Sequence, residues 1–84
     1  MKKNINSIKI LGSDSPEFEE LVYKIKNILL ELDLNIEIEL IKDTDKIISY
    51  NLLSIPALVI NDQILFSGKV PEKEELMKEI IRVL

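Results

Sequence analysis

The stretch Ser15-Pro16-Glu17-Phe18, inside the run GSDSPEFEE at residues 12–20, comes closest to offering reactive chemistry in this sequence. It opens what the apolar spacing predicts to be a long helix. The Ser15 hydroxyl can act as a nucleophile only if a base takes its proton. The sequence has no histidine, and no lysine is nominated as a base by its spacing. Ser15 is more simply a helix N-cap worth about 1 kcal/mol, with Pro16 in the first turn.

The acidic residues do not form a convincing metal or acid–base site. Residues 43–45, Asp-Thr-Asp, resemble the start of a calcium loop, but the template then needs glycine at Ile48 and a bidentate glutamate at Ser54. We therefore expect no metal and no cofactor. We expect the remaining acidic pairs to be solvated surface, namely Glu37 with Glu39 and Glu74 with Glu75.

Composition removes several classes of function. There is no cysteine, so disulfides and thiolate chemistry are impossible, and stability must come from a core drawn from the 46% hydrophobic residues. The net charge is −4 with no basic patch, which disfavours nucleic-acid binding. The opening MKKNINSIKI lacks the apolar run of a signal peptide, and no stretch is long enough to span a membrane. We expect a cytoplasmic protein that does not associate with membranes.

Hydrophobic periodicity positions the elements around these residues. Strands are predicted at 7–11, 35–41, 57–60 and 64–67, with Asn61 and Asp62 as the turn of a closing hairpin. A long helix follows Ser15, and a short helix capped by Asp43 or Thr44 buries Ile47 and Ile48. The last helix is predicted to open at Pro71 and to bury one face, which carries Leu76, Ile80 and Leu84.

The element order is β-α-β-α-β-β-α. Two strands joined by a long helix must be parallel, with a right-handed crossover. The fold class is therefore α/β, a four-stranded mixed sheet with three helices. We expect the strand order 2-1-3-4, with the first and last helices on one face and the short helix on the other. Residues 1–84 are expected to form a single domain.

This order, together with two motifs, resembles the thioredoxin and glutaredoxin core, in particular the small thioredoxin-like proteins called redox-active disulfide proteins. Members of that family usually carry Gly-x-x-Cys-Pro-x-Cys between the first strand and helix, where this chain has GSDSPEF from Gly12 to Phe18. They also carry Ser/Thr-x-Pro-Ala-Leu-Val, matched here by SIPALV at 54–59. The resemblance covers nearly the whole chain and implies a thioredoxin-like fold.

The resemblance assigns the site position by position. Ser15 and Phe18 occupy the places of the two family cysteines, so no catalytic residue is left for dithiol exchange. Pro56 matches the family proline that follows a cis peptide bond, here Ile55–Pro56. The resemblance implies a peptide-binding groove bounded by Ser15, Pro16, Phe18, Ile55 and Pro56. Phe18 is more simply a core residue, since it begins the apolar stripe of the helix, and the alternative is that it shields or extends a hydrophobic groove beside Pro56.

Three functions remain open. The first is a redox-inactive thioredoxin-like module that binds an extended segment of a partner protein by strand addition, as a monomer or a weak homodimer. The second is a thiol–disulfide oxidoreductase whose Cys-Pro-x-Cys has been lost or replaced. The third is a structural role through self-association at an edge strand.

Overall fold

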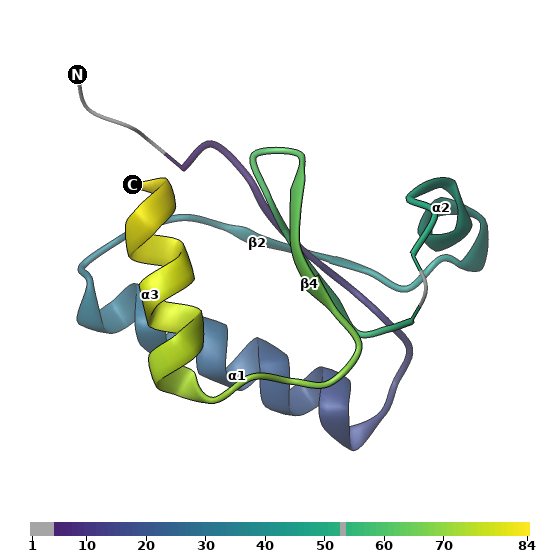
Figure 1. The fold of residues 1–84 in the computed structure, drawn as a ribbon, viewed down its shortest axis with the longest axis horizontal. Helices are drawn as coiled ribbons and strands as arrows, with labels where there is room; N and C mark the ends of the chain where they lie inside the picture. Colours follow the sequence, from purple (N-terminus) through teal and green to yellow (C-terminus); the bar gives the residue numbers. More distant parts are fainter. Residues whose placement is uncertain (1–4, 53) are drawn as a thin grey trace.

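The computed structural model describes residues 5–52 and 54–84. Its elements follow the predicted order, and Figure 1 traces them along the chain. The strands and helices are β1 (Ile8–Leu11), α1 (Pro16–Glu31), β2 (Ile38–Ile41), α2 (Thr44–Ser49), β3 (Ala57–Ile60), β4 (Gln63–Ser67) and α3 (Lys73–Val83). Among the described residues, no helix has both the length and the apolar character needed to cross a membrane.

The sheet has the predicted order, β2-β1-β3-β4. β1 runs parallel to β2 and antiparallel to β3, and β3 and β4 form the closing hairpin. Asn61 and Asp62 both adopt positive φ angles, 51° and 65°, as the tight hairpin turn requires. The Asn61 side chain also accepts a hydrogen bond from the backbone N–H of Asn6 at 2.6 Å, which ties the start of the chain to this turn.

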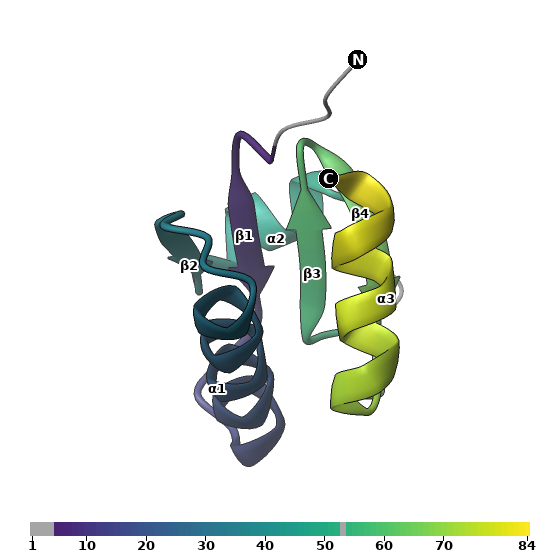
Figure 2. The same ribbon diagram turned by 90° about the vertical axis from the view of Figure 1, so that its left-hand side faces the viewer.

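The three helices lie on the two faces of the sheet as expected: α1 and α3 cover one face and α2 the other (Figure 2). The main core lies under α1 and α3, where Ile10, Ile25 and Ile80 are fully buried. A smaller core lies under α2 and contains Leu11, Ile41, Ala57 and Val59. β3 contributes to both cores because it is an inner strand, which explains why all four of its residues are buried.

Three details of the sequence prediction were wrong. Residues 35–37 are not part of β2, because the pairing with β1 begins only at Ile8 opposite Ile38. Ile48 is 64% exposed and Ile47 is only half-buried, because the six-residue α2 covers just one end of the sheet. α3 begins at Lys73 rather than at Pro71, with Glu72 in the N-cap position and no side-chain cap.

Candidate functional site

The register of the sheet brings the two sequence motifs to one end of the molecule. Leu11 pairs with Ala57 in the antiparallel β1–β3 ladder. The chain leaves β1 after Leu11 and enters β3 before Ala57, so the loop from Gly12 to Ser15 and the residue Pro56 lie at the same end of the sheet. β2 also finishes there, since the Gly12 N–H donates to the Ile41 carbonyl at 3.0 Å.

Ser15 is the N-cap of α1, as predicted. Its backbone is extended (φ −151°, ψ 159°), and its Oγ accepts a hydrogen bond from the Phe18 N–H at 3.1 Å. Its carbonyl accepts from the Glu19 N–H at 3.0 Å, which starts the helical ladder. Pro16 occupies the first turn and is exposed. The Ser15 hydroxyl is therefore used to satisfy one of the N–H groups that a helix start leaves unpaired.

Phe18 belongs to the main core, with 2% of its surface exposed. Its ring packs against Gly12, so closely that a Cβ on Gly12 would come within 2.5 Å of the ring Cδ1. The ring also forms part of the wall of a hollow of about 270 Å³ on the β2 side, together with Leu40 and Lys42. The position that matches the second family cysteine is thus filled by a buried aromatic ring.

Lys42 and Asp14 form an ion pair that sequence reasoning missed. The Lys42 Nζ lies 2.6 Å from the Asp14 carboxylate and 5.5 Å from the centroid of the Phe18 ring. The hydrogen bond and the charge of Asp14 raise the pKa of Lys42 above its usual 10.5. Lys42 is therefore protonated near neutral pH and cannot serve as the base that Ser15 lacks. No sequence pattern signals this pair, because its members are separated by 28 positions and meet only through the β1–β2 pairing.

The Ile55–Pro56 segment lies at the same end of the sheet as the loop from Gly12 to Ser15. The peptide bond between the two residues is cis, the isomer that the family resemblance implies. Pro56 is buried, and its carbonyl accepts a hydrogen bond from the Gly68 N–H at 2.8 Å. Ile55 is 40% exposed, and within the described part of the chain no backbone hydrogen bond involves it. Among the described residues, Ile55 thus combines an exposed apolar side chain with backbone groups that make no backbone hydrogen bond.

The five predicted site residues therefore differ in their surroundings. Ser15, Pro16 and Ile55 are accessible to different degrees, whereas Pro56 and Phe18 are buried. With neither cysteine nor histidine in the sequence, this end of the sheet has no thiol and no imidazole for catalysis. Among the residues that the structure describes, no cluster of three or more candidate metal ligands occurs.

Comparison with known proteins places this geometry in a family. The family model described as a thioredoxin domain matches residues 6–82. The chain is 29% identical over 73 residues to a thioredoxin of Methanocaldococcus jannaschii, covering 87% of this chain and 84% of that protein. It is 30% identical over 71 residues to a thioredoxin of Methanothermobacter thermautotrophicus, covering 84% and 92% respectively. The chain therefore belongs to the thioredoxin-domain family, as a member without cysteine.

Proposed function

We propose that this protein is a redox-inactive thioredoxin-fold module that binds an extended segment of a partner protein beside Ile55 and Pro56. Thiol–disulfide exchange needs a thiolate, and the chain has no cysteine to supply one. Recognition of an extended peptide by strand addition needs only backbone donors and acceptors with an apolar contact beside them. That function survives the loss of both cysteines.

The observation that carries the proposal is the state of Ile55. Ile55 is 40% exposed, whereas Phe18 and Ala57 at this end are buried. Within the described residues its N–H and C=O make no backbone hydrogen bond. An extended peptide running past Ile55 would accept a hydrogen bond from its N–H, donate one to its C=O, and cover its side chain. Pro16, which is exposed at the start of α1, would form the facing side of the groove.

The proposal is tested by selecting ligands without assuming their sequence. A phage-displayed library of short random peptides is panned on the immobilised protein, and an enriched peptide is titrated into ¹⁵N-labelled protein by NMR. We expect the shift changes to centre on residues 12–16 and 54–57. Ile55→Pro, which removes the N–H donor, should weaken binding by about tenfold, the effect of losing one good hydrogen bond in a closed site.

The matched control replaces an exposed isoleucine elsewhere. Ile81 on α3 is 50% exposed, so Ile81→Ala removes a comparable apolar side chain and should leave the affinity unchanged. Ile55→Ala keeps the N–H and removes the side chain, which separates the two contributions. Shift changes confined to another surface, or equal affinity for the wild-type and Ile55→Pro proteins, would refute the proposal.

The oxidoreductase alternative draws its support from the two relatives that are named thioredoxins. It requires thiols at positions 15 and 18, where this chain has Ser15 and the buried Phe18. Reduction of insulin disulfides by the purified protein with a thioredoxin reductase would support it. We expect no rate above that of the reductase alone, because the chain offers no sulfur nucleophile.

A further inference from the structure

β2 is an edge of the sheet, and no described strand pairs with its outer side. The Ile41 carbonyl accepts from the Gly12 N–H, so the backbone groups of Ile41 point inward to β1. Backbone groups alternate sides along a strand in register with one neighbour, so those of Leu40 and Ile38 point outward. An exposed edge of this kind is a template for another extended chain.

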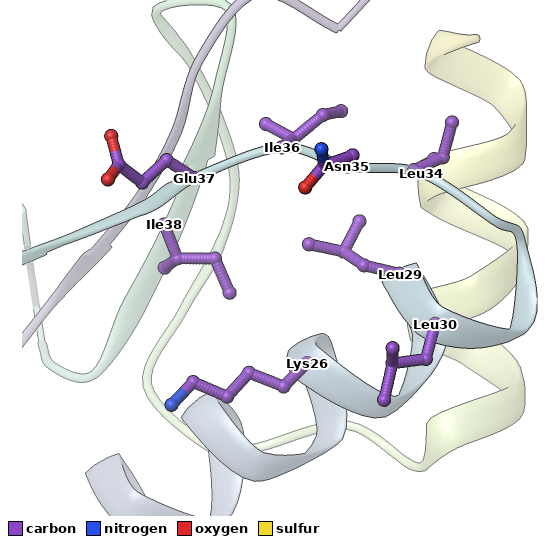
Figure 3. Close-up of a pocket in the computed structure, with 8 residues that line it drawn as sticks. All are labelled: Lys26, Leu29, Leu30, Leu34, Asn35, Ile36, Glu37 and Ile38. Atoms are coloured by element: carbon purple, nitrogen blue, oxygen red, sulfur yellow. The ribbon is translucent and has the colours of Figure 1, made fainter.

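Two hollows flank this edge on the side that faces α1, and their walls combine apolar side chains with Glu19, Lys26 and Lys42. A groove of about 440 Å³ lies between the second half of α1 and the segment leading into β2, and Leu29 and Ile38 point into it from opposite walls (Figure 3). The 270 Å³ hollow beside Leu40 follows it, and Lys26 borders both. Leu30, which is 78% exposed, lies on the rim of the larger groove.

The opposite face of the segment 36–40 carries two glutamates, of which Glu39 is paired in register with Lys9 of β1. Glu37 and Glu39 alternate with the apolar residues Ile36, Ile38 and Leu40, and both glutamates are exposed. Figure 3 shows the Glu37 side chain pointing away from α1, while Ile38 points toward it. A strand added at this edge would therefore place alternate side chains against the two hollows on one face and against the Glu37 and Glu39 carboxylates on the other.

A second copy of this chain is a poor occupant. Antiparallel pairing of β2 with β2 centred on Ile38 places Glu37 of one protomer opposite Glu39 of its partner. Centring on Glu39 places the two Glu39 carboxylates opposite each other, and centring on Leu40 sets Glu37 opposite Asp43. Like charges directly opposite each other destabilise a sheet, and two chains of net charge −4 also repel at longer range.

We propose that the β2 edge and the two hollows beneath it bind an extended segment of another protein in which aliphatic residues alternate with lysine or arginine. The aliphatic side chains fill the hollows beside α1, and the basic side chains face Glu37 and Glu39. The outward backbone groups of Ile38 and Leu40 hydrogen-bond to the added strand. The smaller hollow is lined by Phe18 and Lys42, so this surface reaches the end of the sheet where Ile55 lies but uses the β2 edge rather than the Ile55 backbone.

The test uses a synthetic peptide of about seven residues that alternates lysine and valine, a length that spans residues 35–41 at roughly 3.3 Å per residue. Titration into ¹⁵N-labelled protein should shift the amides of residues 36–41 and of the α1 residues Tyr23 and Leu30. Peptides of equal length that alternate glutamate with valine, or lysine with serine, test the two halves of the pattern. Each should bind at least about tenfold more weakly.

Two charge-reversal variants separate the effect of the charge beside β2 from the effect of the net charge of the protein. Glu37→Lys should weaken binding of the lysine–valine peptide by about fivefold or more, while Glu75→Lys on α3 makes the same change in net charge and should alter it less than about twofold. Equal binding of the acidic peptide, equal loss in both variants, or an absence of shifts at β2 at millimolar peptide would overturn the proposal. A dimer at this edge in sedimentation equilibrium would also overturn it, in favour of a second copy.

Discussion

The Phe18 ring lies directly against Gly12, where a β-carbon would come within 2.5 Å of the ring Cδ1 and within 3.3 Å of Cε1. Gly12 is itself buried and donates its N–H to Ile41. The absence of a side chain at Gly12 therefore leaves room for the aromatic ring at position 18, where the resemblance to the family implies a cysteine. These two positions must be considered as a pair.

Gly12→Ala should destabilise the protein by about 1–3 kcal/mol, because the new methyl group overlaps a ring that buried neighbours hold in place. Urea unfolding followed by circular dichroism measures the free energy of unfolding. In the Phe18→Leu background, which removes the ring, the same substitution should cost less. If the two costs are equal, the ring contact is not what excludes a side chain at Gly12.

Ser15→Ala should lower the free energy of unfolding by about 1 kcal/mol, because the Phe18 N–H then loses its 3.1 Å acceptor. Ser15→Asp keeps an acceptor and adds a favourable charge at the helix start, so it should recover most of that loss. Chemical denaturation of the three proteins gives the comparison. A fully stable Ser15→Ala protein would show that water caps the helix equally well.

Much of the fold could be predicted from the sequence because its signals are local. The helix spacing from Phe18 to Leu32, the buried run 57–60 and the Asn61–Asp62 turn each determine an element without knowledge of the others. The errors arose where a neighbour decides the outcome. β2 begins only where β1 can pair with it, and Ile48 is exposed because no described segment covers the outer side of α2.

The candidate site was less predictable for the same reason. The sequence indicates the capping role of Ser15, because Ser-Pro-Glu is a typical pattern at the start of a helix. The Asp14–Lys42 pair depends on the β1–β2 register, and the position of Phe18 against Gly12 depends on how α1 sits on the sheet. The alternation of Glu37 and Glu39 with apolar residues is visible in the sequence. That the outer edge of β2 lies beside two hollows follows only from the packing of α1.

The ion pair of Lys42 should give a stability contribution that depends on alkaline pH. Asp14 raises the pKa of Lys42 above 10.5 in the folded protein, so the contribution is fully present below pH 10.5 and is lost as the pH rises through the folded pKa. The difference in unfolding free energy between wild type and Lys42→Gln should therefore shrink over that range. Asp14→Asn is the control, because in that background the shrinkage should largely disappear.

Gly68→Ala should also be destabilising, for a backbone reason. Gly68 has φ +105°, a conformation that L-residues rarely adopt, and a β-carbon there would lie 2.7 Å from the Ser54 Oγ. We expect a loss of about 1–3 kcal/mol in thermal or urea unfolding. Ser54→Ala removes the contact but not the backbone cost, so the double variant should regain only part of the loss. Full recovery would mean that the contact alone sets the cost.

Ser15→Cys should create a thiol whose pKa lies below the usual value of about 8.5, because the thiolate would take over the hydrogen bond from the Phe18 N–H at the start of α1. The rate of alkylation by iodoacetamide as a function of pH reports that pKa. Ser13→Cys is the matched control: Ser13 is exposed in the same loop but is not the N-cap, so its thiol should titrate at a higher pH. Equal pH profiles for the two thiols would show that the start of α1 does not lower the pKa of a thiol at position 15.

Adding Phe18→Cys to Ser15→Cys should allow a disulfide to form between the two positions. Loss of the buried ring should lower the free energy of unfolding by about 3–5 kcal/mol. A double variant that reduces insulin but unfolds more readily than wild type would show that the buried ring stabilises the fold at the expense of the dithiol site.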